Sequence, residues 1–312
     1  TLLFATGQTD AAQIFPSDIP WLESAKDIYG FRILFRGPDA DRSLICLNQN
    51  NGKTGIAPFK RKWFRNKAFR QALLYGFNRK KIIQSVYWDQ AKQIDSFFAP
   101  NNKKWYFDRV KKYRYNSEKA RALLEKAGFS KKGDQLFDKK GNPVIFTLIF
   151  AANSVGSREK EALIFKQDMK KLGIKVKVRQ VDITKRNQSI TGSLDYEAAM
   201  IGFSGEGEDP SSAENVLSSA GKLHIWNLNA KNKPTAWEER IDTLIEKQKV
   251  EFDERKRRQI FFEIQKIMAE ELPLLFLNAP LRYTGIKKRW QNVQIPPQSS
   301  ILWNIECLWA KE

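Results

Sequence analysis

The clearest pattern of apolar and polar positions lies over Trp63–Trp88, where two helices are expected in succession. Asn66 and Asn78 each precede a helical stretch and are typical N-cap residues. Apolar residues recur at the spacing that places them on one helix face, at Phe69, Ala72, Leu73, Gly76, Ile82, Ile83 and Val86. The pattern therefore predicts a pair of amphipathic helices that bury one face in a core.

A second pattern predicts parallel strands. An apolar run over Val144–Phe150 is followed by a helical period over Ser157–Leu172 and then by the alternating residues Ile174–Val181. A strand, a helix and a second strand, with Gly173 before the last, make a βαβ unit in which the strands are parallel. A further strand is expected over Tyr196–Phe203.

Other strands are expected near both ends of the chain. Short apolar runs predict them over Arg32–Phe35, Ser43–Leu47, Leu274–Asn278 and Ile301–Trp309. Lys103–Arg114 shows no clean period and is expected to be a surface loop.

Three further helices have start signals of their own. Asn116 precedes a helix that Gly128 should end, since glycine is the usual C-terminal cap. Thr235 and Glu238 form a capping box, and Asp253 precedes a last long helix.

The composition is that of a soluble globular protein. With 312 residues and 42% hydrophobic content, the chain can form one large or two modest domains. No apolar run is long enough to cross a membrane, and the N-terminal residues lack the features of a signal peptide. Because the chain does not begin with Met, we expect a mature or excised piece, and the missing signal peptide indicates no compartment.

Two cysteines, Cys46 and Cys307, lie in apolar runs near opposite ends of the chain. Two thiols without nearby histidines do not supply the four ligands of the usual zinc site, so no metal site is expected. Two buried free thiols are the simpler interpretation. A disulfide is the alternative if the two segments are neighbours.

The net charge of +19 is concentrated over Lys53–Arg121, where nineteen Lys or Arg residues stand against four Asp or Glu residues. Aromatic residues are interspersed there, at Trp88, Trp105, Tyr106, Tyr113 and Tyr115. Such a composition is typical of a nucleic-acid surface, and also of a face near anionic lipid. A solvated surface on a basic protein is the simpler interpretation, and a nucleic-acid-binding module over residues 53–121 stays an alternative.

The sharpest local feature is the glycine-rich acidic stretch Gly202–Val216, which follows the strand predicted to end at Phe203. Ligands of open α/β sheets bind beyond the carboxyl ends of strands. The glycines do not match a phosphate-binding loop, and Glu206, Glu208 and Asp209 would attract a cation or an amine. A solvated turn is the alternative.

The sequence holds no convincing catalytic set. Glu206 and Glu208 lie two residues apart on one stretch, whereas paired acid and base carboxylates face each other across a cleft. His224, the only histidine, lies among apolar residues and is expected to be structural. We therefore expect neither catalysis nor a cofactor, and a hydrolase that uses Glu206 or Asp209 is the third interpretation of the chain.

The order of these elements resembles that of the bacterial extracellular solute-binding proteins of the peptide and nickel class, family 5, which deliver substrate to ABC importers. The likeness rests on the strand Leu44–Leu47, the Asn-rich turn after it, the helical sequence FRNKAFRQALLYGFNRKKII and the later YNSEKARALLEKAGF. It extends from Gly7 to Trp309. It implies a type II periplasmic-binding-protein-like α/β fold, with a mixed sheet and flanking helices.

The resemblance also implies a division of the chain. Residues 1–45 would be part of the N-terminal lobe, residues 46–278 the C-terminal, ligand-binding lobe, and residues 279–312 a return into the N-terminal lobe. Because the family runs two connections between its lobes side by side, Cys46 and Cys307 are expected to be close, whether bonded or not. The first 45 residues and Ile301–Trp309 should then share a partial sheet.

The implied function is capture of a small solute, most simply a peptide, between two lobes and its delivery to an ABC permease. The protein would lie in the periplasm or be anchored to the outer face of the cytoplasmic membrane, and no nucleic acid is expected as a partner.

Peptide-binding members of the family carry a tryptophan and then an acid that pairs with the peptide's α-amino group; here Phe203 and Glu206 take these places. The ligand contacts implied are Phe203, Ser204, Gly205, Glu206, Gly207, Glu208 and Trp226. Trp226 either lines the cleft or packs under the acidic stretch. Because Phe and Glu replace the family's Trp and Asp, the identity of the solute stays open.

Overall fold

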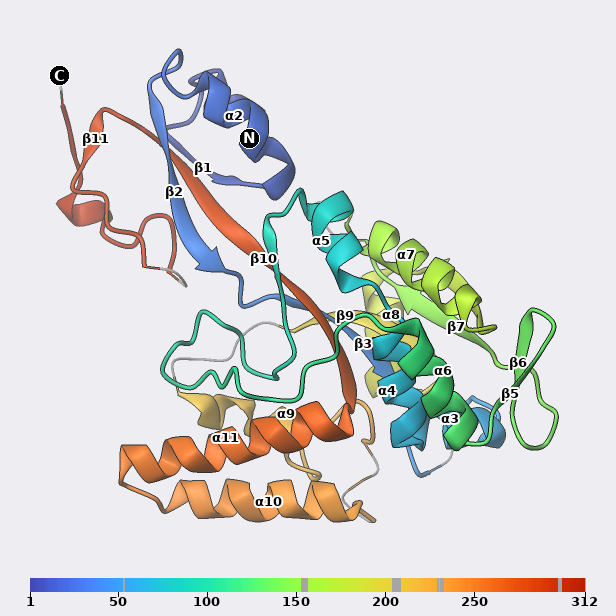
Figure 1. Ribbon diagram of the computed structural model, residues 1–312. Coiled ribbons are helices and arrows are strands. Elements are labelled where there is room, and N and C mark those ends of the chain that lie inside the picture. Colours follow the sequence, from blue (N-terminus) through green and yellow to red (C-terminus); the bar gives the residue numbers. More distant parts are fainter. Residues whose placement is uncertain are drawn as a thin grey trace.

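The computed structural model describes residues 1–52, 54–152, 157–203, 209–228, 230, 233–296 and 299–311 (Figure 1). Its centre is a mixed sheet in the order β1–β10–β3–β9–β7–β8, with β2 and β4 also paired to β10. These strands are β1 (Ala11–Ile14), β2 (Phe31–Pro38), β3 (Arg42–Leu47), β4 (Ala91–Gln93), β7 (Ile145–Phe150), β8 (Lys175–Gln180), β9 (Ala198–Phe203) and β10 (Leu274–Lys287). Two short ribbons, β5 (Ser130–Lys132) with β6 (Gln135–Phe137) and β11 (Trp290–Gln291) with β12 (Trp309–Ala310), lie apart from this sheet.

Helices flank the sheet along much of its length (Figure 1). The α-helices are α1 (Leu2–Ala5), α2 (Ile19–Ala25), α3 (Pro58–Arg65), α4 (Lys67–Tyr75), α5 (Arg79–Tyr87), α6 (Ser117–Lys126), α7 (Ser157–Lys171), α8 (Ile183–Thr191), α9 (Glu214–Leu217), α10 (Ala236–Lys249) and α11 (Glu254–Glu271). Short 3-10 helices are η1 (Pro16–Asp18), η2 (Pro210–Ala213) and η4 (Ile305–Cys307).

The predicted βαβ unit is confirmed. β7 pairs in parallel with β8 over its whole length and in parallel with β9 on its other edge. β9 then pairs antiparallel with β3, and β3 antiparallel with β10. The fold is therefore α/β with a mixed sheet, as the sequence indicates.

The predicted helix starts are also confirmed. The side chains of Asn66, Asn78, Asn116 and Asp253 accept hydrogen bonds from backbone N–H groups three residues later, and Thr235 and Glu238 form the capping box. The helix α3, which comes directly before α4 and begins with a proline at its first position, was not predicted from the sequence.

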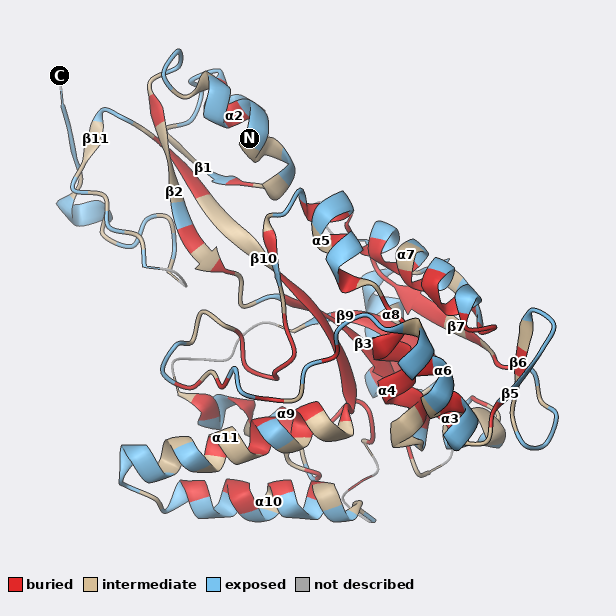
Figure 2. Cartoon of the chain, viewed as in Figure 1, coloured by how far each residue is buried: buried red, intermediate tan, exposed pale blue. Residues whose placement is uncertain are grey.

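β10 joins two bodies of the molecule (Figure 1). Its first half pairs with β3 and β4, and its second half, from Leu281 to Lys287, pairs with β1 and β2. Each half has its own apolar cluster. The larger cluster surrounds the first half, and the smaller one consists of Phe4, Ala5, Ile14, Leu22 and Phe31. Figure 2 shows the first half of β10 buried and the second half a mixture of intermediate and buried residues.

Two expectations about the chain ends are wrong. Ile301–Trp309 is not a strand of the large sheet but a series of turns and the helix η4, and β12 after it pairs only with β11. The first 45 residues therefore do not share a sheet with this segment. The reason is that β10 extends well beyond Asn278, to Lys287, and itself provides the hydrogen bonds for β1 and β2.

The expected proximity of the cysteines is also wrong. Cys46 is fully buried in β3 and lies opposite Leu274 of β10. The strand that runs beside β3 from one body to the other is therefore β10, and not the segment that contains Cys307. Cys307 is exposed in η4, and both thiols are free. Burial raises the pKa of the Cys46 thiol to about 12.

The segment Lys103–Arg114 is irregular, as predicted, but it is not simply a surface loop. Trp105, Phe107 and Tyr113 are buried in it. The Trp105 ring contacts Phe261 of α11 with centroids 5.6 Å apart, and the Tyr113 hydroxyl donates to the carbonyl of Ala269 at 2.9 Å. These aromatic side chains fix the segment against α11.

A buried arginine connects four distant parts of the larger body. The Arg79 guanidinium donates to the carbonyl oxygens of Ile94 at 2.7 Å and Phe276 at 2.8 Å, and also to that of Tyr113. It forms an ion pair with Asp95 at 2.7 Å. Burial lowers the pKa of Arg79, but these acceptors surround the charge. The helix α5 is thereby tied to β10 and to two irregular segments.

Replacing Arg79 with alanine should lower the free energy of unfolding by about 3 to 5 kcal/mol, because the buried Asp95 would lose its charged partner and keep only the hydrogen bonds from Gln93 and the Tyr113 N–H. Urea unfolding of the 312-residue chain measures this. The exposed neighbour Lys80, changed to alanine, is the control and should alter stability by less than about 0.5 kcal/mol. Equal effects of the two substitutions would show that Arg79 does not hold these segments.

Candidate functional site

The acidic stretch begins where the central strand β9 ends. Phe203, the last residue of β9, lies opposite Arg42 of β3 and is partly buried. Its ring centroid lies 6.0 Å from that of Phe97. Phe203 therefore lies at the carboxyl end of β9, and its contact with a ligand stays a prediction.

Five of the predicted site residues, Ser204, Gly205, Glu206, Gly207 and Glu208, lie outside the described residues. The residues on either side, Phe203 and Asp209, are described, and from here on the acidic stretch means residues 203–209, the part of Gly202–Val216 that contains Glu206, Glu208 and Asp209. The contacts of the five residues with a ligand stay a prediction.

Asp209 is held by an arginine of α11. The two carboxylate oxygens accept from Arg257 at 2.6 and 2.7 Å, and one of them also accepts from the backbone N–H of Ser211 at 2.9 Å. The hydrogen bonds from Arg257 hold the pKa of Asp209 well below its ordinary value. Asp209 therefore fixes the end of the acidic stretch, and this ion pair makes it a poor general acid or base for a hydrolase.

A small polar cavity of about 170 Å³ adjoins the end of β9 and lies between the two bodies that β10 joins. It is lined by Gln13, Ile14, Phe15, Pro16, Asp39, Asp41, Ser43, Tyr87, Ser157, Arg158, Pro280, Leu281 and Arg282. Gly202 lies at its edge, since a Cβ atom there would be 2.3 Å from Asp41 Oδ1 and 2.9 Å from Arg158 Nη2. The cavity and the start of the acidic stretch are therefore neighbours.

The wall of this cavity is held by a buried carboxylate, Glu161 of α7. Its oxygens accept hydrogen bonds from the side chains of Ser43 at 2.6 Å, Tyr87 at 2.8 Å and Asn278 at 3.0 Å. Burial and the charge of Glu161 raise the pKa of Tyr87 well above its ordinary value, so Tyr87 stays a neutral donor. Glu161 thereby joins α7 to β3, α5 and β10 at the point where the two bodies meet.

Arg158 provides a positive charge at the same wall. It is buried, lies 3.6 Å from Glu161 and 3.9 Å from Asp41, and donates to the hydroxyl of Ser43. Such a wall can bind a polar group by hydrogen bonds and charge. Sequence reasoning missed Arg158 and Glu161, although their spacing to Phe165 places them on the buried face of the predicted helix.

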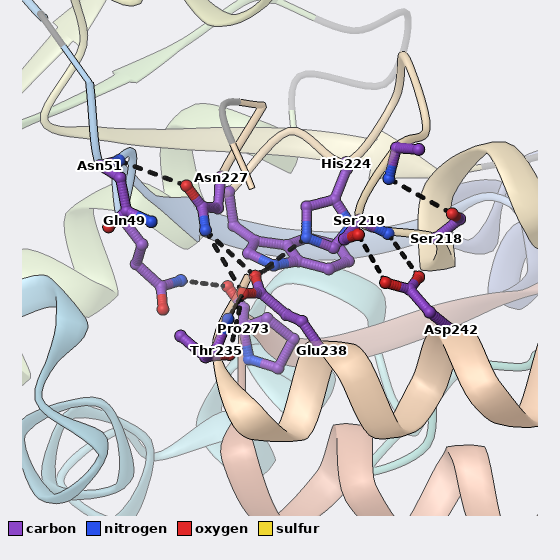
Figure 3. A network of polar contacts seen from close by, with 12 residues as sticks. Gln49, Asn51, Ser218, Ser219, His224, Asn227, Thr235, Glu238, Asp242 and Pro273 are labelled. Carbon is purple, nitrogen blue, oxygen red and sulfur yellow. Dashed lines mark hydrogen bonds and ion pairs between the residues drawn. The ribbon is translucent and has the colours of Figure 1, made fainter. Parts of the chain in front are cut away.

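A second buried carboxylate organises the segment beyond the acidic stretch (Figure 3). Glu238 of α10 is within hydrogen-bonding distance of His224 at 3.0 Å, the Trp226 indole at 3.2 Å and Asn227 at 3.2 Å, and it also accepts from Thr235. Burial opposes the charge, but the hydrogen bonds from His224 and Thr235 lower the pKa of Glu238 to about 2. His224 is structural, as expected.

Trp226 is fully buried beside His224, with ring centroids 4.0 Å apart. Its side chain packs in the interior, which is the second of the two positions expected for it. It is not exposed at the surface of the described residues. Its backbone carbonyl accepts from the N–H of Gln49 at 2.8 Å, and Asn227 accepts from the N–H of Asn51 at 3.3 Å. The Asn-rich turn after β3 is thus held against this segment, as Figure 3 shows.

The basic and aromatic residues between positions 53 and 121 are divided between interior and surface. Arg70, Arg79, Trp105 and Tyr113 are buried, and Arg70 donates to the carbonyl of Leu272 at 2.9 Å. Those side chains hold the fold and are not available to stack on bases. Fewer basic and aromatic side chains are therefore at the surface than the composition suggested, which weakens the nucleic-acid interpretation.

Within the part of the chain that the structure describes, no helix has the length and apolar character needed to span a bilayer.

Comparison with known proteins gives one consistent result. Residues 1–223 match the family model for bacterial extracellular solute-binding proteins, family 5 Middle. A probable ABC transporter-binding protein of Deinococcus radiodurans is 30% identical over 276 residues, which are 84% of this chain and 46% of that protein. The oligopeptide-binding protein AppA of Bacillus subtilis is 27% identical over 259 residues, which are 80% of this chain and 45% of that protein.

The fold agrees with these sequence matches. The solved structure of the oligopeptide-binding protein AppA from Bacillus subtilis in complex with a nonapeptide superposes with a TM-score of 0.78 at 22% identity, over 100% of this chain and 58% of that one. The chain thus spans about half the length of the curated relatives it matches. The expected periplasmic-binding-protein-like fold is confirmed.

The Glu238 cluster should make stability depend on pH. The pKa of Glu238 is lowered from 4.5 to about 2 on folding, so the charged carboxylate stabilises the fold above about pH 4.5 and loses this effect as the pH falls towards 2. We expect a loss of about 3 kcal/mol from this group across that window. Urea unfolding over a series of pH values measures it.

The variant Glu238→Gln should be less stable at neutral pH and should lack this part of the acid-dependent loss. Glu239→Gln, an exposed neighbour on α10, is the matched control and should follow the unsubstituted chain. Parallel pH profiles for Glu238→Gln and the unsubstituted chain would contradict the assignment.

Proposed function

The chain belongs to family 5 of the bacterial extracellular solute-binding proteins, and on that premise we propose that it binds a small solute, most simply a peptide, for an ABC importer. The observation that best supports this is the polar cavity between the two bodies, with Gly202 and the start of the acidic stretch at its edge. A cleft between bodies encloses a ligand from several sides, which is where most of its contact area arises.

The acidic stretch would supply the contacts for a positively charged group of the solute. Glu206 and Glu208 would attract an amine, and Phe203 would provide an apolar contact beside it. The ion pair of Asp209 with Arg257 would keep the end of the stretch in place. This arrangement favours a ligand with an amino group, as a peptide has.

The lobes of this proposal are residues 1–45 with 279–312, and residues 46–278. The two separate apolar clusters support a division into two lobes, because each body has a core of its own, but Leu44, Ile45 and Ala279 pack in the larger cluster and so shift the bounds by a few residues. The chain crosses between them at the β2–β3 connection and along β10, so these crossings are the natural hinge. A ligand would close the lobes only by binding the closed arrangement more tightly than the open one.

The partner would be a permease in the cytoplasmic membrane, and the protein would lie in the periplasm or on the outer face of that membrane. The relatives named above are binding proteins, and we propose that this chain is likewise a binding protein and not an enzyme. The fixed positions of Asp209 and His224 support this, since each is already engaged with a charged partner.

A thermal-shift screen of the full-length product of the gene should identify the solute, because a ligand that binds only the native state raises its stability. Peptides, metal chelates and sugars are the classes to compare. We expect stabilisation by a peptide with a free amino terminus. Stabilisation by sugars alone would contradict the peptide proposal.

With the solute in hand, Glu206→Gln should weaken its binding by about 1.5 to 3 kcal/mol, the range for a hydrogen bond to a charged group. Folding should hardly change. Titration calorimetry measures the affinity, and Glu239→Gln, on the exposed side of α10, is the control of equal charge. Unaltered affinity of the Glu206 variant for the solute would exclude Glu206 as the amine contact.

A further inference from the structure

The outward face of α7 has an unusual composition. Lys160, Leu163, Lys166 and Lys170 follow one another at spacings of three or four residues, which place them on one side of the helix. All four are exposed, and Leu163 is 41% exposed. The opposite side of α7 carries the core residues Ala162, Phe165 and Met169. A leucine therefore lies open to solvent in a row of lysines.

Two exposed aromatic residues stand at the two ends of this helix. Trp88 follows α5 and is 45% exposed, with Lys160 Nζ 5.7 Å from its ring centroid. Tyr115 precedes α6 and is 42% exposed, with Lys171 Nζ 5.9 Å from its ring centroid. Each ring thus combines an apolar surface with a nearby ammonium group. We call Trp88, Tyr115, Lys160, Leu163, Lys166 and Lys170 the α7 face.

Among the described residues, no carboxylate forms an ion pair with Lys160, Lys166 or Lys170. Within the described residues, the ion pairs of α7 involve Arg158, Glu161, Asp168 and Lys171, and none involves these three lysines. Lys166 and Lys170 also border a cavity of about 260 Å³ together with Lys175 and one carboxylate, Asp134, which forms no ion pair with them among the described residues. The positive charge of the face is therefore available to an anionic partner.

The helices α10 and α11 also carry exposed basic residues. Some exposed charges there are paired, for example Arg240 with Glu263 and Lys249 with Glu246, while Lys247, Arg255 and Lys256 form no ion pair among the described residues and serve below as the control. Lys170 and Lys171 also suit the negative end of the α7 dipole, but that effect explains only the last turn. It does not account for Lys160, Leu163 or the exposed rings.

We propose that the α7 face docks on a membrane surface that contains anionic phospholipids. Lysine side chains attract lipid phosphates, while Trp, Tyr and Leu side chains enter the boundary between headgroups and acyl chains. The partner is thus a lipid surface. At one end of the face, Trp88 and Lys160 line a pocket that adjoins the candidate solute cavity through Tyr87 and Ser157. The lipid contact would keep a solute-binding protein close to the membrane in which its permease lies.

The aromatic contacts favour lipid over nucleic acid. Single-stranded nucleic acids stack their bases on open aromatic rings, but a lysine lies over each ring of the α7 face. Leu163 has no role on a phosphodiester backbone, whereas it contributes apolar area at a bilayer interface. The combination of lysine with exposed apolar groups therefore fits a lipid surface better.

Co-sedimentation of the 312-residue chain with vesicles tests the proposal. Vesicles of phosphatidylcholine mixed with phosphatidylglycerol should bind the chain, pure phosphatidylcholine should not, and added salt should weaken the binding. The triple variant Lys160→Gln, Lys166→Gln, Lys170→Gln should lower the partition coefficient on the order of 100-fold, since each lysine near an anionic surface contributes several-fold.

The control removes the same charge elsewhere. A second triple variant carries Lys247→Gln, Arg255→Gln and Lys256→Gln, at exposed residues of α10 and α11. It should keep most of the vesicle binding. Loss of binding equal to that of the α7 variant would overturn the proposal in favour of net charge alone. No binding to the phosphatidylglycerol vesicles by the unsubstituted chain would overturn it outright. Urea unfolding of every variant confirms that it is folded.

Leu163→Gln tests the apolar contact without a change of charge and should lower vesicle binding several-fold, whereas Val250→Gln, at a more exposed apolar site after α10 (73% against 41% for Leu163), should not. A greater loss from Val250→Gln would place the contact at the α10–α11 turn and overturn the proposal.

Binding to duplex and single-stranded DNA is measured as a second test. Tighter binding to DNA than to the vesicles, abolished by the α7 triple variant, would replace the lipid with a nucleic acid.

Discussion

The strand β10 is the constraint on which the rest of the structure depends. A strand has two edges, and β10 uses both twice, with β3 and β4 along its first half and with β1 and β2 along its second. Register shifts near Asn278 and Arg282 mark the change from one set of partners to the other. Two bodies with separate cores are thereby hydrogen-bonded to one continuous backbone, and the space between them is the polar cavity.

Buried charges fix the irregular segments that surround this crossing. A buried charge is costly without partners, so Glu161, Glu238 and Arg79 each gather hydrogen bonds from several elements that are distant in sequence. Glu161 holds the cavity wall, Glu238 holds the segment after the acidic stretch, and Arg79 holds α5 against β10. The positions of both ends of the candidate site thus depend on polar contacts in the interior as well as on apolar packing.

The positive charge of the chain has more than one physical role. Some arginines, such as Arg70 and Arg79, are interior hydrogen-bond donors to carbonyl groups. Arg257 neutralises Asp209 at the end of the acidic stretch. The lysines of the α7 face remain at the surface without carboxylate partners among the described residues. A count of basic residues over Lys53–Arg121 merges these roles, and for that reason it suggested a nucleic-acid surface.

The sequence by itself determined the features that depend on near neighbours. Asn66, Asn78, Asn116 and Asp253 cap helices because a cap needs only backbone groups within the next turn. The parallel pairing of β7 and β8 follows from the helix between them. The acidic residues after β9 are close together in the sequence and can be recognised there directly. The family resemblance, which rests on this local order, is likewise confirmed.

Only the tertiary structure decided which distant segments meet. Any strand can satisfy the hydrogen bonds of another, so the sequence could not show that β10, and not Ile301–Trp309, pairs with the first strands, or that Cys46 lies opposite Leu274. For the same reason it predicted Phe203 and the acidic stretch but missed the cavity wall of Ser43, Arg158 and Glu161. Those side chains come from separate elements, and their proximity exists only once the sheet and α7 have packed together.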